Sequence, residues 1–195
     1  MNITQDKLNF FSLFKRNFLY RFKKKINIDH QENIDNSSLD KLFTFYNTDK
    51  ANIVDNGTKK GHGFTKFYEK KLNQFKDKKK INILEIGSFS GASAAAFSKY
   101  FPNSQIYCLD INLLNFKFYS KKIHVFGMNS SDNKMMIKFL NKINFFEKIN
   151  FFDIIIDDGS HILSDQLKAL NFFYKYVKKA GFYIIEDYKL LDHFN

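Results

Sequence analysis

Residues 83–93 read ILEIGSFSGAS, and this stretch decides the fold class. An apolar run ends at Ile86, glycines stand at positions 87 and 91, and an alanine- and serine-rich segment begins at Ala92. Because glycine has no Cβ, a ligand can approach the backbone closely at such a turn, and the helix that follows offers free amide groups. The stretch therefore predicts a strand, a tight turn and a helix, with a ligand site at the turn.

The chain from Ile81 onward repeats this alternation of short apolar runs and longer segments. Nearly continuous apolar runs are typical of strands covered on both faces, and hence of a parallel sheet. We expect an α/β fold, a Rossmann-like parallel sheet with helices on both faces and right-handed crossovers. The expected strands are 81–86, 105–110, 122–126, 151–157 and 181–186, and the expected helices of this part are 92–100, 132–143 and 164–179.

Polar residues fall where the expected strands end, which is where open α/β sheets bind ligands. The glycine spacing, Gly-x-x-x-Gly, differs from the dinucleotide fingerprint and argues against a nicotinamide enzyme. Glu-x-Gly-x-x-x-Gly followed by Asp110 resembles the S-adenosylmethionine site of class I methyltransferases. That resemblance implies ribose contacts by Asp110 and adenine contacts near the end of the third strand; the alternative is an ordinary tight turn. The residues it assigns to the cofactor here are Glu85, Gly87, Ser88, Gly91, Asp110, Asn129 and Ser130.

Acidic residues also end the fourth and fifth expected strands. The fourth ends in Asp-Asp-Gly-Ser-His at 157–161, and the fifth ends in Glu186-Asp187. Carboxylates at close range repel one another unless protons or a cation intervene, and a hard divalent ion such as Mg²⁺ resolves that conflict. The alternative is that these aspartates cap a helix or face solvent and that His161 is a structural histidine.

The DDGSH and IED segments, with Thr48-Asp49-Lys50, His62-Gly63-Phe64 and Tyr68, resemble the metal-dependent sugar O-methyltransferases of macrolide biosynthesis and their cephalosporin-hydroxylase-like relatives. The similarity covers roughly residues 42–188, although the family often has tyrosine where Phe64 stands. The resemblance implies a cofactor and acceptor lid formed by the upstream segments. Position by position, it makes Asp158, Glu186 and Asp187 the metal ligands, His161 the general base with Asp157 as a second catalytic residue, Thr48 and Lys50 cofactor-binding residues, and His62 and Tyr68 acceptor or lid residues.

The chemistry of such a site is coherent by itself. A sugar hydroxyl is a weak nucleophile at neutral pH, and metal coordination lowers its pKa. Histidine then takes the proton at a pH near its own pKa. We therefore expect a divalent-metal-assisted O-methyltransferase that uses S-adenosylmethionine and Mg²⁺ on a hydroxyl of a sugar or glycan-like small molecule.

The N-terminal part has a different character. Residues 1–25 interleave phenylalanines with lysines and arginines, which predicts a basic amphipathic helix that either contacts a membrane surface or packs on a neighbouring domain or subunit. Although the net charge is +11, the only arginines are Arg16 and Arg21, and nucleic-acid readout favours arginine. A nucleic-acid partner is therefore not expected. With a single cysteine and no long apolar span, we expect a cytoplasmic protein, which is peripheral to the membrane if the basic helix contacts lipid.

We divide the chain into an N-terminal segment and linker at 1–37, a helical region at 38–80 and an incomplete cofactor-binding domain at 81–195. Ser37 and Asp40 indicate a helix start, and a further helix is expected from Thr65 to Phe75. Class I methyltransferases continue well past the fifth strand, whereas this chain stops at Asn195. Three alternatives follow for the edge of the fifth strand: the sequence is a fragment of a longer protein, a homo-oligomer covers this edge, or the product is truncated and poorly active. The alternative function is a truncated cofactor-binding module that uses its basic helix on a membrane surface or a partner.

Overall fold

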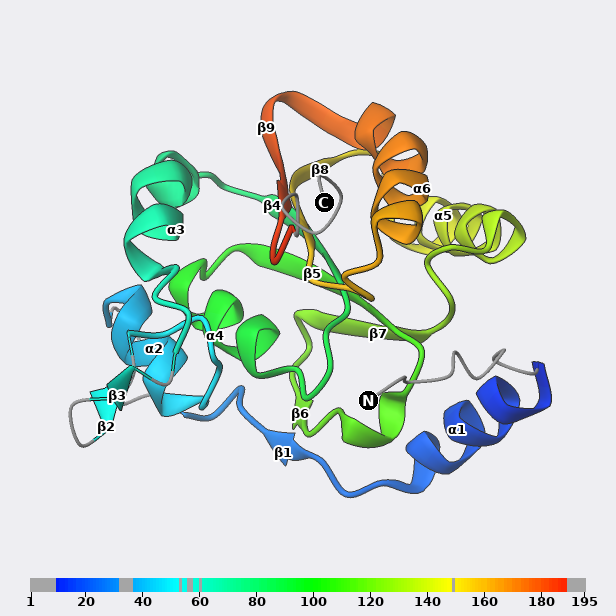
Figure 1. Cartoon of the computed structure of the whole chain (residues 1–195), viewed down its shortest axis with the longest axis horizontal. Helices are drawn as coiled ribbons and strands as arrows, with labels where there is room; N and C mark the ends of the chain where they lie inside the picture. Colours follow the sequence, from blue (N-terminus) through cyan, green and yellow to red (C-terminus); the bar gives the residue numbers. More distant parts are fainter. Residues whose placement is uncertain are drawn as a thin grey trace, which may run out of the picture.

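A five-stranded parallel sheet forms the centre of the molecule in the computed structural model, which describes residues 10–31, 37–52, 54–55, 58–59, 61–148 and 150–188. The strands lie in the order β7-β5-β4-β8-β9 (Figure 1). All four neighbouring pairs are parallel, as the apolar runs predicted. Their bounds are β4 Ile81–Ile86, β5 Ser104–Asp110, β7 Ile123–Gly127, β8 Phe152–Asp157 and β9 Val177–Ile185.

Helices cover both faces of this sheet (Figure 1). One face packs against α2, α3 and α4, where Phe43, Tyr68 and Phe97 form a buried aromatic cluster. The other face packs against α5 and α6 through Phe139 and Phe173. The bounds are α2 Leu39–Phe45, α3 Thr65–Leu72, α4 Ala92–Tyr100, α5 Asn133–Glu147 and α6 Leu163–Phe173, with short 3₁₀ segments at Asn73–Phe75, Leu113–Asn115 and Tyr174–Tyr176.

The N-terminal helix α1, Phe10–Phe22, lies against the edge of the sheet at β7. Leu13 is buried there, and the Asn17 side-chain amide donates to the Gly127 carbonyl at 2.9 Å. The chain then forms β1, Ile26–Asn27, which pairs in parallel with β6, Phe118–Tyr119. Since Ile28 is fully buried, the segment after α1 is attached to the domain rather than extended from it. A two-residue hairpin, β2 Val54–Asp55 with β3 Thr58–Lys59, completes the elements.

Several sequence expectations are wrong at the level of boundaries, including the strand expected at 181–186, which is Val177–Ile185. The expected helix 164–179 ends at Phe173, because Val177 pairs with Phe152 and the Lys178 ammonium binds the buried Asp153 carboxylate at 2.8 Å. These contacts draw residues 177–180 into the sheet. The helix expected to start at Ser37 is capped instead by the side chain of Ser38, which accepts from the Lys41 amide.

Other expectations are left without a test. Residues 1–9, most of the predicted linker at 32–36 and the last residues, 189–195, lie outside the described residues. In the described part, β9 borders only β8, so the homo-oligomer expected along its other edge stays a prediction. No helix in the described ranges combines the length and the apolar character that crossing a bilayer requires.

Candidate functional site

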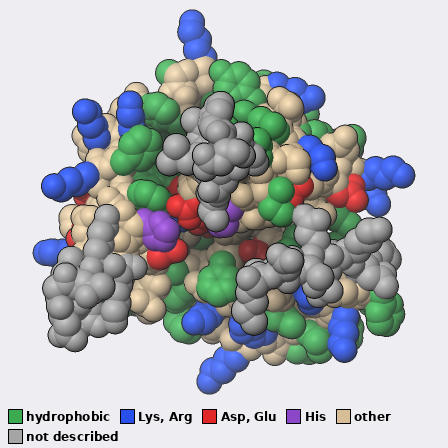
Figure 2. Space-filling view, in the orientation of Figure 1, with side chains coloured by type: hydrophobic (Ala, Val, Ile, Leu, Met, Phe, Trp, Pro, Cys, Tyr) green, Lys and Arg blue, Asp and Glu red, His purple; other side chains and the backbone are tan. Residues whose placement is uncertain are grey.

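A cavity of about 460 Å³ opens at the carboxyl ends of β4, β5 and β8. Figure 2 shows acidic and histidine side chains gathered around the hollow on this face of the molecule. Eight residues assigned to the site from the sequence line the cavity, together with residues that the sequence analysis did not single out for the site, including Asn47, Phe89 and Ser93. The eight are Thr48, Lys50, Gly87, Ser88, Asp110, Asp158, His161 and Asp187.

The glycine turn forms one wall of the cavity, and its two glycines are required for packing. Gly87 has φ +80°, and a Cβ there would lie 2.1 Å from the Asp158 carbonyl oxygen. Gly91 has φ +75°, and its Cβ would lie 2.5 Å from the ring of Phe116. Any other residue at either position would push the turn away from the β8 loop or from the 3₁₀ segment that precedes β6. The turn is therefore held at a fixed distance from the acidic residues that follow β8.

Asp110, at the end of β5, holds this turn in place. Its carboxylate accepts from the Phe89 amide at 2.7 Å and from the Asn112 amide at 2.6 Å. Glu85 lies below the cavity floor, fully buried, and accepts from the Ser93 hydroxyl; burial raises the pKa of Glu85. Asp110 thus lines the cavity, whereas Glu85 contacts Ser93, which lines it.

Three side chains converge on the opposite wall. Ligand atoms of Asp158, His161 and Asp187 all lie within 4.8 Å of one another. Asp158 Oδ1 is 3.9 Å from His161 Nε2, and Asp187 Oδ1 is 3.5 Å from His62 Nδ1. His161 and Asp187 have φ values of +54° and +51°, a region that residues other than glycine rarely adopt. Such outliers are typical of sites where the backbone is held in a strained form to aim a side chain.

Glu186, expected beside Asp158 and Asp187, points elsewhere. It is buried, its Oε2 accepts from the Lys50 ammonium at 2.5 Å, and its Oε1 accepts from the Tyr68 hydroxyl. The same ammonium donates to Asp158 Oδ2 at 2.6 Å. Burial raises the pKa of Glu186 and, with the carboxylate beside it, that of Tyr68. Burial alone would lower the pKa of Lys50, but Glu186 and Asp158 raise it above its ordinary value.

Asp157 lies on the other side of the strand end from Asp158. Its carboxylate accepts from the Tyr183 hydroxyl and from the Gly159 amide, both at 3.2 Å, and it does not line the cavity. Alternation along β8 explains the difference, since successive side chains point to opposite faces of a sheet. Burial raises the pKa of Asp157 to about 6. A catalytic role for Asp157 therefore stays a prediction, and no contact between Asp157 and the cavity supports it.

The remaining expected residues lie around the site. Asn129 and Ser130 follow β7 in the loop before α5, outside the cavity lining. His62 is 3.7 Å from Asp49 and, with Asp187, bridges the upstream segment to the end of β9. Sequence reasoning missed two residues near the site. The Gln166 side-chain amide donates to the Glu186 carbonyl at 3.3 Å, and the Tyr183 hydroxyl donates to the Asp157 carboxylate. The only sequence signal for Gln166 was its place as a polar residue on the inner face of an expected helix.

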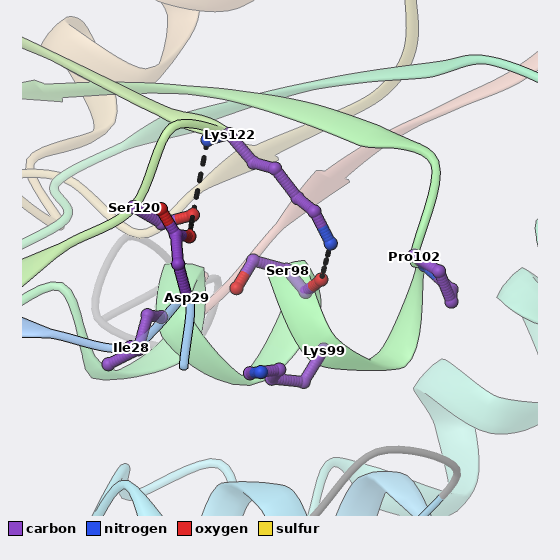
Figure 3. Close-up of a pocket in the computed structure, with 7 residues that line it drawn as sticks. All are labelled: Ile28, Asp29, Ser98, Lys99, Pro102, Ser120 and Lys122. Carbon is purple, nitrogen blue, oxygen red and sulfur yellow. Dashed lines mark hydrogen bonds between the residues drawn. The ribbon is translucent and has the colours of Figure 1, made fainter. Parts of the chain in front are cut away.

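A second cavity, of about 300 Å³, lies between α4 and the segment after α1 (Figure 3). Its lysines are already engaged, because Lys122 Nζ donates to the Ser98 carbonyl at 3.1 Å and Lys99 Nζ donates to the Gln31 carbonyl at 2.8 Å. Asp29 accepts from the Ser120 hydroxyl at 2.5 Å. The bonds to Gln31 and Asp29 attach the N-terminal segment to the domain, so this cavity is a structural junction.

Known proteins are similar to this chain in sequence. No protein-family model matches the chain. L-olivosyl-oleandolide 3-O-methyltransferase of Streptomyces antibioticus is 29% identical over 157 residues, covering 76% of this chain and 36% of that protein. Mycinamicin VI 2''-O-methyltransferase of Micromonospora griseorubida is 29% identical over 133 residues, covering 65% of this chain and 31% of that protein.

A solved structure agrees with these relatives. The MycE methyltransferase of the mycinamycin pathway, in complex with Mg, SAH and mycinamycin VI, superposes with a TM-score of 0.62 and 28% identity, covering 77% of this chain and 37% of that one. In sequence and fold, the chain is similar to class I S-adenosylmethionine-dependent methyltransferases of the mycinamicin type. It spans about a third of the length of the curated relatives that it matches.

The donor set of this methyltransferase fold fits a divalent ion. Asp158 and Asp187 offer carboxylate oxygens, and His161 offers a ring nitrogen from the same cavity wall. Mg²⁺ prefers oxygen ligands, so the two carboxylates suit it without a contribution from the His161 ring. The cofactor half fits as well, because the Gly87–Gly91 turn and Asp110 form a continuous wall beside these donors.

Asp157 makes stability depend on pH. Its pKa of about 6 lies above the ordinary value of 3.8, so the folded chain binds a proton that the unfolded chain has lost between those values. The free energy of unfolding of the wild type should therefore fall, by about 2 to 3 kcal/mol relative to Asp157→Asn, as pH rises from about 4 to 6. Urea denaturation of both proteins across this range measures the difference. Parallel pH curves would contradict the assignment.

Proposed function

We propose that this chain forms the catalytic core of an O-methyltransferase that transfers the methyl group of S-adenosylmethionine to a hydroxyl of a sugar, with help from a divalent metal ion. The observation that carries the proposal is the convergence of Asp158, His161 and Asp187 on one wall of a cavity whose other wall is the glycine turn. The named activities of the relatives, which methylate sugar hydroxyls of macrolides and tetracenomycins, support the same reaction class.

In this proposal each wall of the cavity has its own task. The turn at 87–91 and the Asp110 carboxylate bind the donor, with Asp110 accepting from ribose hydroxyls. Asp158 and Asp187 hold the ion, which when bound lowers the pKa of the acceptor hydroxyl. His161 Nε2 takes the hydroxyl proton as the oxygen–methyl bond forms and the sulfonium–methyl bond breaks. Since His161 is 37% exposed and lies in the cavity wall, an acceptor can reach it.

Cofactor binding is the first test. Isothermal titration with SAH should show binding by the wild type, and Asp110→Ala should weaken it at least tenfold, or about 1.4 kcal/mol, because it removes the ribose acceptor and frees the Phe89 amide. Asp132→Ala is the matched control, since Asp132 caps α5 away from the cavity. Circular dichroism checks that each variant folds. Failure of the folded wild type to bind SAH would contradict the proposal.

Turnover tests the second wall. His161→Ala should lower the methylation rate of a rhamnosyl or olivosyl acceptor by about 10² to 10⁴, the range expected for a general base, without changing SAH affinity. Asp187→Asn should lose the stimulation by Mg²⁺ or Mn²⁺. His30→Ala serves as control, because His30 is exposed and belongs to the segment after α1. An unchanged rate in His161→Ala, or activity that persists in chelator, would remove the corresponding role.

We also propose, from a separate observation, that α1 contacts an anionic membrane surface. Phe11, Phe14, Phe18 and Phe22 recur at intervals of three and four residues and are 49–75% exposed. They lie opposite Leu13, which is buried, and Tyr20, which packs edge-on against Phe116. The helix is thus attached by one face and presents an aromatic face to solvent.

The charges around α1 favour lipid as the occupant of that face. From Phe11 to Lys25 the sequence has six cations and no carboxylate, and Lys15, Arg21 and Lys24 are exposed. Exposed aromatic side chains between cations suit the boundary between acyl chains and anionic headgroups. A protein partner would instead have to offer an acidic rim around an apolar groove.

Sedimentation with vesicles tests this contact. The protein should bind vesicles rich in phosphatidylglycerol more tightly than vesicles of phosphatidylcholine alone, and Phe14→Ser/Phe18→Ser should reduce binding at least tenfold because less apolar surface is buried. Phe145→Ser/Phe146→Ser is the matched control, since both rings are exposed on α5. Equal binding to both vesicle types, or equal loss in both variants, would contradict the proposal.

A further inference from the structure

Lys50 is the most deeply buried cation of the site. Its side chain is 2% exposed, yet its ammonium lies 2.6 Å from Asp158 Oδ2 and 2.5 Å from Glu186 Oε2. The backbone on either side is also fixed, because the Lys50 carbonyl accepts from the Phe64 amide at 3.0 Å and the Asp49 carbonyl accepts from the His62 amide at 2.6 Å. The ammonium therefore has a defined position between the ends of β8 and β9.

The two carboxylates are divided by this ammonium. Asp158 Oδ2 accepts from the Lys50 ammonium, and Asp158 Oδ1 lies 3.9 Å from His161 Nε2. Glu186 Oε2 accepts from the Lys50 ammonium and Oε1 accepts from the Tyr68 hydroxyl, so both of its oxygens are engaged. As a result Glu186 is absent from the group whose ligand atoms converge, although it neighbours Asp187 in sequence.

Three carboxyl groups surround the Lys50 ammonium. Glu85, Asp158 and Glu186 all act on its charge through space, while Lys50 is the cation that contacts the latter two. Removing one member of a buried ion pair leaves the other unpaired at a large cost in stability. A second cation placed beside Asp158 would meet both the attraction of the carboxylates and the repulsion of the ammonium.

We propose that Lys50 is an internal counter-ion that occupies the position between Asp158 and Glu186, confines a divalent ion to the side of Asp158 that faces Asp187, and lowers the affinity for that ion. The inference deepens the proposed function and rests on its divalent ion. It makes Lys50 a positioning residue that sets metal affinity and ligand choice, whereas the resemblance implied a cofactor contact.

Mn²⁺ alone is the probe, because its binding is read by electron paramagnetic resonance without any turnover. Lys50→Met should bind Mn²⁺ at least tenfold more tightly than the wild type. Glu186→Gln should change the affinity of the wild type little and should weaken binding in the Lys50→Met background, because Glu186 becomes free to ligate. Lys78→Met is the matched control: its ammonium binds buried Asp153 at 3.2 Å at the opposite ends of the strands.

Thermal unfolding provides a second readout, and Lys50→Gln a second variant should the methionine variant fold poorly. In chelator, both variants should have a lower melting temperature than the wild type. Mn²⁺ should raise the melting temperature of both variants by more than it raises that of the wild type. Equal or weaker Mn²⁺ binding by both variants would overturn the proposal. If no variant binds Mn²⁺ while all bind SAH, the role of Lys50 falls with the metal and the cofactor half of the proposed function stands.

Discussion

One buried ammonium joins the two strand ends on which the site is built. Asp158 and Glu186 reach the same edge of the sheet because β8 and β9 are parallel neighbours. Without a cation between them, the negative charges of Asp158 and Glu186 would repel one another. Lys50 supplies that cation from the helical region before the sheet, and its position depends on bonds to His62 and Phe64. Packing of this helical region and assembly of the site are therefore coupled through a single side chain.

The cavity has to meet two requirements that call for different electrostatic surroundings. A sulfonium donor needs a close, uncharged approach to backbone, which the turn around Gly87 provides. A divalent ion needs concentrated negative charge, which Asp158 and Asp187 provide across the cavity. The contact between Gly87 and the Asp158 carbonyl keeps these walls at a set separation. Partial neutralisation by Lys50 keeps the acidic wall from being an uncompensated cluster.

Much of the sheet could be predicted from the sequence, because β4 and β8 are buried along their whole length and leave continuous apolar runs. The end of α6 could not, since the pairing of Val177 with Phe152 depends on tertiary contacts. The meeting of Asp158 with Asp187 followed from parallel strand ends, and the opposite direction of Asp157 follows from strand alternation. The turn of Glu186 toward Lys50 and Tyr68 could not be predicted, because it depends on how α3 packs.

The central claim is that donor and divalent ion share the cavity at the ends of β4, β5 and β8. The most direct measurement is a crystal structure of the chain with SAH and Mn²⁺, with the ion located by its anomalous scattering. The account predicts the ion in direct contact with Asp158 and Asp187, and SAH against the turn at Gly87 with its ribose at Asp110. An ion bound away from both carboxylates, or SAH bound outside this cavity, would contradict it.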